Sequence, residues 1–276
     1  MRSYRTLFLS DLHLGTRWCH TEALLGFLGE VTCQQLYLVG DIVDGWKLRR
    51  NPCWPQSHND VIRKLLKLSR RVRTTYITGN HDAFLDAFDG TSFGNILLTK
   101  QATHRGADGR RYLVVHGDEF DGVVQAQAWL ARCGDVAYDL ALWLNKGLWA
   151  VRRRMGMPYW SLSQYMKGRV KDAVSFMGDY QNALAREARR AGADGVICGH
   201  IHSAALMETE NLVYANCGDW VESCTALAEH PDGRLEVLSW PFPPEDLPRV
   251  TAGGELVLPE TPLSQVAPSG VWSEYA

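Results

Sequence analysis

The segment Thr78-Gly79-Asn80-His81-Asp82 stands directly after the apolar and β-branched run 72–77. By itself this segment predicts a turn between two elements. Four other short clusters of Asp, Asn or His stand in the same setting, each where an apolar run stops. They are Asp11-Leu12-His13, Gly40-Asp41, His116-Gly117-Asp118 and Gly199-His200-Ile201-His202. Because open α/β sheets place their sites beyond the carboxyl ends of the strands, we expect these side chains to converge.

The residues before this segment alternate between strand and helix patterns. We expect strands at 4–10, 35–39 and 72–77, an amphipathic helix at 20–31, a loop at 46–55, and a second helix with Ser57 as its N-cap;. The order β-α-β-α-β predicts a layered α/β fold.

The second half of the chain contains a long helical stretch between two of the clusters. Residues 96–98 and 111–115 read as strands with a turn at 107–109, whereas 123–191 shows only helical spacing up to a stop at Gly192;. The strand pattern resumes at 195–198, 212–215, 224–229 and 234–240, with a hairpin turn at 231–233.

We therefore expect one domain over residues 1–240, with a helical cap inserted at about 122–192. Residues 241–276 contain seven of the 11 prolines of the chain. This composition predicts an irregular C-terminal tail.

Composition excludes several classes of protein. A net charge of −2 gives no overall bias toward nucleic acid, so no nucleic-acid partner is expected;. Seven Cys without a CxxC pair suit reduced thiols in a cytosolic protein;. No window approaches the ~20 apolar residues that cross a bilayer, and Ser10 and Asp11 interrupt the first apolar run too early for a signal peptide.

Carboxylate and imidazole groups in these clusters predict a site for two divalent ions. Such ions, roughly 3.5–4 Å apart, clamp a phosphoryl group for in-line attack. Asp41 is the candidate for a carboxylate shared by both ions. We expect Asp11, His13 and His202 to complete one metal site, and Asn80, His116 and His200 to complete the other. This donor set favours Mn²⁺, with Fe²⁺ and Zn²⁺ as alternatives.

His81 has a different expected role, because it does not easily point at the same ion as Asn80. We expect it to stabilise charge on phosphorus or to protonate the leaving oxygen, with Asp82 holding its tautomer. Asp44, Asp118 and Asp121 fit two interpretations equally well: solvated turn residues, or partners that orient a ligand. The four remaining histidines, His20, His58, His104 and His230, are expected to be surface or capping residues.

The five clusters, in this order, resemble the calcineurin-like metallophosphoesterase superfamily. Asp-x-His, Gly-Asp-x-x-Asp, Gly-Asn-His-Asp, His-Gly-Asp and Gly-His-x-His span Asp11 to His202. The resemblance implies a four-layer αββα sandwich. It also implies hydrolysis of phosphomonoester, phosphodiester or pyrophosphate bonds.

Within that superfamily the chain most resembles the UDP-2,3-diacylglucosamine pyrophosphohydrolases of the lipid A pathway and their relatives. The similarity rests on LFLSDLHLG at 7–15, LYLVGDIVDGW at 36–46 and the helical insertion after His116-Gly117-Asp118. It implies cleavage of the pyrophosphate of a nucleotide-linked glycolipid, with release of UMP. Two departures are His81, where those enzymes typically carry Arg, and the segment Glu119-Phe120-Asp121.

The expected cap contains a basic segment with interleaved aromatic residues. Seven cations and no acid lie between Lys146 and Lys171. This mixture fits a surface that meets anionic lipid head groups, or a site that holds substrate phosphates. The candidate substrate-binding residues are Arg152, Arg153, Arg154, Trp160 and Lys167. The same residues also fit an ordinary helical core with solvated helix ends.

Three functions remain open at this point. The first is a pyrophosphohydrolase acting on a nucleotide-linked glycolipid, cytoplasmic or peripheral at the inner membrane, which the basic cap favours. The second is a soluble phosphodiesterase or phosphatase acting on a nucleotide or another small phosphoester, which His81 favours. The third is a non-catalytic scaffold, which predicts missing ligands, whereas every ligand position of this chain is filled.

Overall fold

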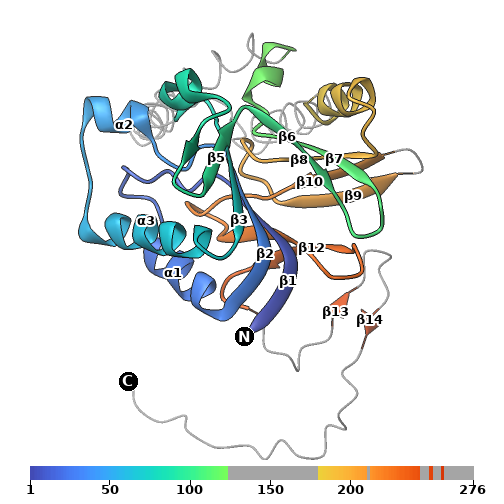
Figure 1. The fold of residues 1–276 in the computed structure, drawn as a ribbon, viewed down its shortest axis with the longest axis horizontal. Helices are drawn as coiled ribbons and strands as arrows, with labels where there is room; N and C mark the ends of the chain where they lie inside the picture. The colour runs from blue at the N-terminus through green and yellow to red at the C-terminus, as the bar shows by residue number, and fades with distance from the viewer. Residues whose placement is uncertain (124–179, 210–211, 243–248, 251–255, 258–276) are drawn as a thin grey trace, which may run out of the picture.

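The computed structural model describes residues 1–123, 180–209, 212–242, 249–250 and 256–257 (Figure 1). In chain order the elements are β1 (Arg2–Leu9), α1 (Thr21–Glu30), β2 (Val31–Val39), α2 (Gly45–Arg50), α3 (Gln56–Ser69), β3 (Arg73–Ile77), the 3-10 helix η1 (Ala83–Phe88), β4 (Ser92–Phe93), β5 (Ile96–Thr99), β6 (Gln101–Arg105), β7 (Arg111–Val115), the 3-10 helix η2 (Asp118–Val123), β8 (Gly195–Cys198), β9 (Ala205–Thr209), β10 (Leu212–Asn216), β11 (Thr225–Glu229), β12 (Leu235–Ser239), β13 (Arg249–Val250) and β14 (Leu256–Val257). A further helix covers residues 180–190.

Apart from the short pair β13–β14, the described strands form two mixed sheets. The larger sheet has the order β12-β11-β1-β2-β3-β5-β4, and the smaller has the order β6-β7-β8-β10-β9. Strands β1, β2, β3 and β5 are parallel neighbours, as are β7, β8 and β10. Parallel neighbours place their carboxyl ends at the same edge of a sheet, which is where the polar clusters of the sequence begin.

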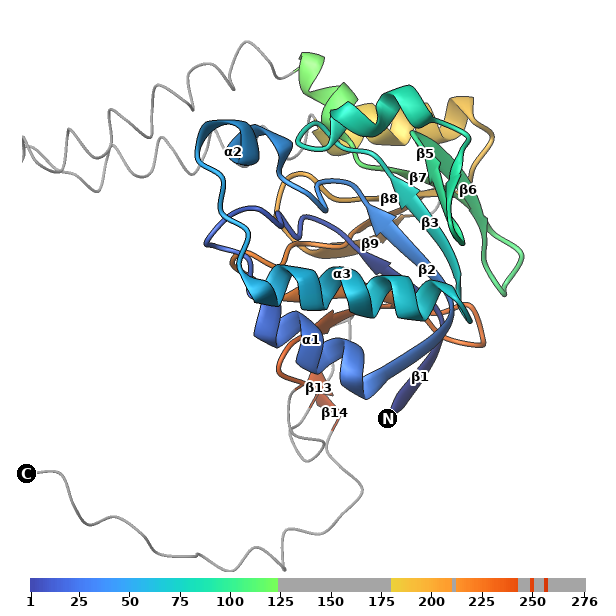
Figure 2. The same cartoon turned by 60° about the vertical axis from the view of Figure 1, so that its left-hand side comes forward.

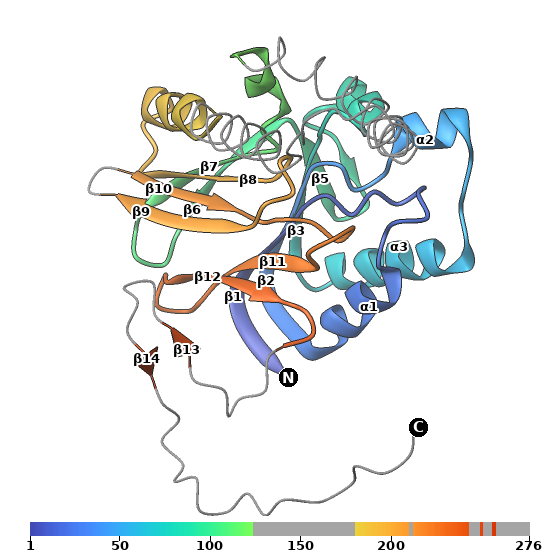
Figure 3. The same ribbon diagram turned by 180° about the vertical axis from the view of Figure 1, so that it is seen from behind.

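Alternating side chains divide the interior into three layers of core. In β1, Phe8 joins the core between the two sheets, whereas Leu7 and Leu9 join the core beneath α1 and α3 (Figure 2). In β8, Ile197 faces the larger sheet, whereas Val196 packs with residues of helix 180–190. Figure 3 shows the smaller sheet and this helix from behind. Strands buried on both faces therefore produce an αββα sandwich, as the family resemblance implied.

Most of the expected strands and the first helices are present within one or two residues of their predicted bounds. The hairpin turn at 231–233 joins the antiparallel strands β11 and β12. Gly192 follows the helix 180–190 with φ +65°, a left-handed conformation that suits a helix stop;.

Several expectations were wrong. The turn at 107–109 joins β7 to β6, which the sequence pattern did not reveal, because four of the five residues of β6 are at least partly exposed. The predicted loop 46–55 contains the helix α2, and α3 begins one residue before Ser57, with Pro55 as its N-cap residue. His58 and His104, expected at the surface, are buried.

The expected cap lies almost wholly outside the described residues. Of it, the structure describes η2 and the helix 180–190. In the predicted tail, β13 and β14 form a short antiparallel pair, and Phe242 packs against Phe27 with 5.6 Å between ring centroids. Among the helices that the structure describes, none combines the length and apolar character needed to cross a membrane.

A buried carboxylate joins the two sheets at the end opposite the polar clusters. Glu229 of β11 is fully buried and accepts hydrogen bonds from Thr6 Oγ1 at 2.6 Å and the Ala107 amide at 2.8 Å. His104 Nε2 of the smaller sheet lies 2.9 Å from Glu229 Oε2, the oxygen that Thr6 also meets. Arg5 Nη1 donates to Glu229 Oε1 at 2.5 Å. Burial alone would raise the pKa of Glu229, but the bonds from His104, Thr6 and Ala107 lower it to about 2.

Replacing Glu229 with Gln is expected to lower the free energy of unfolding at pH 7 by about 2 kcal/mol, because the amide cannot satisfy four donors. The folded pKa lies below the ordinary value of 4.5, so the ionised group stabilises the fold above pH 4.5. This contribution is lost as the pH falls toward 2. Urea unfolding at pH 7 and pH 3 measures the difference between Glu229→Gln and the parent protein.

Glu208→Gln is the matched control, because Glu208 is exposed and its ion pair among the described residues is with the exposed Arg110. Its effect should stay below about 1 kcal/mol at both pH values. Equal losses of unfolding free energy in the two variants would show that Glu229 contributes no more to stability than an exposed charge does.

Candidate metal centre

The polar clusters end their strands in an unusual backbone conformation. Asp11, His13, Asp41, His200 and His202 have φ between 49° and 71°. Among the described residues, Cys224 is the only other non-glycine residue with positive φ. Such conformations cost of order 1–3 kcal/mol each and concentrate at functional sites, where the surrounding fold enforces them. Here they turn five side chains toward one region beyond the strand ends.

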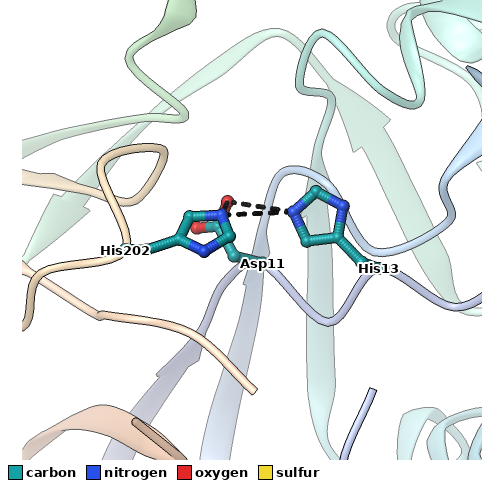
Figure 4. Close-up of side chains that lie close together, drawn as sticks. All are labelled: Asp11, His13 and His202. Carbon is teal, nitrogen blue, oxygen red and sulfur yellow. Dashed lines mark hydrogen bonds and ion pairs between the residues drawn. The ribbon is translucent and has the colours of Figure 1, made fainter. Parts of the chain in front are cut away.

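Asp11, His13 and His202 form the first group (Figure 4). Asp11 Oδ1 lies 3.3 Å from His202 Nε2 and 3.8 Å from His13 Nε2, and the two imidazole nitrogens are 3.3 Å apart. Three potential ligand atoms thus face one point from the ends of β1 and β8. The other carboxylate oxygen of Asp11, Oδ2, accepts hydrogen bonds from the His200 amide at 2.9 Å and from Ser10 Oγ, and these bonds fix the orientation of the carboxylate.

Asp41 connects this group to two further histidines. Its Oδ2 lies 3.3 Å from His116 Nε2 and 3.8 Å from His13 Nε2. Asp41, His116 and His200 form a second group of close ligand atoms, from the ends of β2, β7 and β8. The same carboxylate therefore faces both groups, which is the arrangement that a bridging ligand requires.

The backbone around Asp41 leaves space only for glycine. A Cβ at Gly79 would lie 2.5 Å from Asp41 Oδ1 and 2.6 Å from the His116 ring, and one at Gly40 would overlap the same ring. His116 Nδ1 lies 3.0 Å from the Val39 carbonyl, to which it donates. With Nδ1 directed at this carbonyl, Nε2 is the nitrogen that faces Asp41 and could bind an ion.

These residues fit a divalent cation, and two observations support this. First, Asp11 Oδ1, Asn80 Oδ1 and His116 Nε2 are buried and form no hydrogen bond with any described residue. Buried polar atoms are nearly always paired, so atoms that face one another without bonding have the character of metal ligands. Second, the site attracts positive charge. Burial alone would lower the pKa of His116, but Asp41 and Asp11 raise it to about 10.

His81 lies at the rim of this centre, between Trp46 and His13. Its ring centroid is 4.2 Å from that of Trp46 and 4.7 Å from that of His13. Its Nε2 lies 3.9 Å from Asp41 Oδ2, and its backbone amide donates to Asp41 Oδ1 at 2.8 Å. His81, His13 and Asp41 also form a group with metal-ligand spacing, so geometry alone allows His81 either role.

The expected partnership of His81 with Asp82 was wrong. Asp44 Oδ2 forms a hydrogen bond with His13 Nδ1 at 3.2 Å and lies 3.0 Å from His81 Nδ1, a contact without hydrogen-bond geometry, so Asp44 is the carboxylate beside both rings. Its Oδ1 accepts from the Lys47 amide at 2.7 Å and caps α2. Burial alone would raise the pKa of Asp44, but the two histidines and this amide lower it.

Asp82 instead stabilises the loop after β3 by hydrogen bonds on the buried side of that loop. It is fully buried and accepts from Tyr76 Oη at 2.6 Å, from the Gly79 amide at 2.5 Å and from the Ile42 amide at 2.8 Å. These bonds tie the loop after β3 to the loop after β2. Residue spacing alone does not separate the two carboxylates, because Asp44 and Asp82 both follow a strand end by a few residues.

All seven expected metal ligands fall among the described residues. Six of them belong to the groups above, and the seventh, Asn80, has a buried and unpaired Oδ1. Arg152, Arg153, Arg154, Trp160 and Lys167 lie outside the described residues. Trp46 is the neighbour of the centre that the sequence reading missed. The only available signal was its place two residues after the last Asp of the Gly-Asp-x-x-Asp motif.

Comparison with known proteins points in one direction. The sequence model described as calcineurin-like phosphoesterase matches residues 4–204. The chain is 29% identical over 206 residues to the UDP-2,3-diacylglucosamine hydrolase of Edwardsiella ictaluri, covering 73% of this chain and 77% of that enzyme. It is 30% identical over 116 residues to the enzyme of the same name from Blochmanniella pennsylvanica, covering 41% of this chain and 46% of that relative. The match therefore spans less than half of the second relative.

A solved phosphoesterase from E. coli superposes with a TM-score of 0.39 at 13% identity, covering 85% of this chain and 98% of the other.

Proposed function

The chain belongs to the calcineurin-like phosphoesterase family and is a phosphoester hydrolase, and we propose that it cleaves the pyrophosphate of UDP-2,3-diacylglucosamine or a related nucleotide-linked glycolipid. The products would be UMP and an acylated sugar phosphate. The observation that carries the reaction type is the Asp41 carboxylate, which faces histidines of both ligand groups. The relatives named as hydrolases of this glycolipid support the substrate.

We infer that the centre holds two divalent ions, most favourably Mn²⁺. Asp11, His13 and His202 would bind one ion, Asn80, His116 and His200 the other, and Asp41 both. Oxygen and imidazole donors without a thiolate suit this metal. When bound, such a pair of ions supplies Lewis-acid polarisation of the phosphoryl group and activates water for in-line attack.

The residues of the chain position the other groups of the reaction. The His81 imidazolium would direct Nδ1–H toward Asp44 and Nε2–H toward the centre, where the Nε2 proton would pass to the leaving oxygen;. The Trp46 ring, tilted by 32° against His81 with 4.2 Å between the centroids, would restrict the rotation of His81. The cap residues Arg152, Arg153, Arg154, Trp160 and Lys167 remain proposed contacts to the substrate or to anionic lipid, with a location at the cytoplasmic face of the inner membrane.

One observation favours a second candidate, a soluble phosphodiesterase or phosphatase acting on a small phosphoester. His81 stands where the glycolipid hydrolases typically carry Arg, and its contacts with Asp44 and Trp46 support the proposed role as a proton donor. A centre of this kind is not restricted to lipid substrates.

Removal of the metal is expected to abolish hydrolysis reversibly. Because the seven proposed ligands come from five separate loops, little catalytic geometry remains without an ion. Dialysis against EDTA should reduce UMP release from UDP-2,3-diacylglucosamine to background, and Mn²⁺ should restore it, as measured by chromatography of UMP.

Bis(p-nitrophenyl) phosphate, assayed beside the glycolipid, separates the two candidate functions. Mn²⁺-dependent activity on both substrates, with strong UMP release, is the expected result. Activity on the small diester alone would overturn the glycolipid proposal and leave the phosphodiesterase. Full activity after complete metal removal would contradict the metal mechanism itself.

A further inference from the structure

A cavity of about 550 Å³ opens beside the metal centre on the His116 side. It lies between the loop after β3, the turn from β5 to β6, and the start of η2. His116 and Gly79 are among its lining residues, so the cavity adjoins two of the loops that form the metal centre. The His116 side chain is fully buried, and its Nε2 has no hydrogen-bond partner among the described residues. The volume is in the range of small-molecule sites.

The walls of this cavity are acidic. Asp86, Asp89, Asp118 and Glu119 line it, with Lys100 as the single cation among its described lining residues. Lys100 Nζ lies 2.9 Å from Asp86 Oδ2, so its charge is already paired. The remaining carboxylates disfavour a second phosphate and favour groups that donate hydrogen bonds.

This chemistry distinguishes the two halves of a nucleotide-linked glycolipid. Acyl chains require apolar walls, whereas the cavity presents carboxylates together with Thr99 and Gln101. A nucleoside presents ribose hydroxyls and the imide N–H of uracil, which are donors without charge. We propose that the acidic cavity is the nucleoside subsite, which takes the uridine of the substrate while its phosphate lies at the metal centre. This inference rests on the proposed function.

The opposite rim differs in character. Trp46 and Lys47 of α2 are exposed beyond His81, and Arg49 and Arg50 follow them. In an in-line displacement the attacking water and the leaving group lie on opposite sides of the phosphorus, and the retained half projects to the side of that axis, so the two halves leave the phosphorus in different directions. The polar half therefore fits the cavity at His116, and the acylated half leaves toward Trp46.

The test compares binding of UMP and of inorganic phosphate to the Mn²⁺-loaded protein by titration calorimetry. The variant is Asp89→Asn with Glu119→Gln, which removes two wall charges and changes no proposed ligand. Loss of two hydrogen bonds should weaken UMP binding about tenfold. Phosphate binding should stay equal or become slightly tighter. Glu22→Gln with Asp232→Asn, two exposed acids outside the cavity, is the charge-matched control and should change neither affinity.

Three outcomes would overturn the assignment. They are unchanged UMP binding in the cavity variant, equal weakening of UMP and phosphate, or choline phosphate binding more tightly than UMP, which would make the cavity a site for cationic groups. Hydrolysis of UDP-2,3-diacylglucosamine is scored separately. Selective loss of UMP binding without glycolipid hydrolysis would refute the substrate and keep the nucleoside subsite. If the glycolipid is hydrolysed but the cavity variant binds UMP as tightly as the parent protein, the nucleoside subsite alone is refuted.

Discussion

Replacing Asp41 with Ala is expected to lower the rate of phosphoester hydrolysis by at least about 1,000-fold, because even partners behind metal ligands typically contribute 10–100-fold. The Asp41 carboxylate faces His13 and His116 at once, so its loss weakens both proposed ion sites. Elemental analysis after gel filtration in Mn²⁺ should show less than half of the parental metal content. The rate on bis(p-nitrophenyl) phosphate measures the loss of activity.

Asp60→Ala is the matched control for this experiment. Asp60 lies on α3, and its described ion pair is a long one to the exposed Arg63. Metal content and rate should both stay at the parental level in this variant. An Asp41→Ala protein that retains its metal and more than a tenth of its activity would refute the shared-ligand assignment. Circular dichroism should show the same fold for both variants, because Asp41 contributes no apolar contact to the cores.

The positions of the site residues were predictable from sequence because they depend on strand ends. An apolar run that stops at a polar cluster marks both the end of a strand and the direction of the site. Asp11, Asp41 and His116 were placed in this way, and they lie together as expected. The order of strands followed less directly, since β6 carries little apolar signal.

Hydrogen-bond partners were less predictable than positions. The choice between Asp44 and Asp82 as the partner of His81 depends on how two loops pack. Asp82 accepts hydrogen bonds from Tyr76 and from two backbone amides on the buried side of the loops. Asp44 is therefore the carboxylate that lies beside the His81 imidazole. Similarly, His104 is buried only because Glu229 of a distant strand accepts its bond. Such pairings arise from tertiary contacts that no local pattern contains.

Replacing His81 with Gln is expected to lower kcat by about 100- to 10,000-fold while metal content stays unchanged, the range typical of a lost general acid. The reason is its orientation. Nδ1 lies 3.0 Å from Asp44 Oδ2, and Nε2 lies 3.9 Å from Asp41 Oδ2 at the rim of the centre. Rates on bis(p-nitrophenyl) phosphate and elemental analysis of the same samples measure the two quantities.

Metal content decides between the two roles that geometry allows His81. Loss of metal in His81→Gln would assign it as a ligand beside His13 and Asp41 and would refute the proton-donor role. Asp44→Asn provides the companion measurement, with an expected loss of about 10- to 100-fold in kcat from the misoriented ring. If Asp44 acts through His81, the double variant should be little slower than His81→Gln alone. Any additional loss then reports the second ring that Asp44 holds, which is His13.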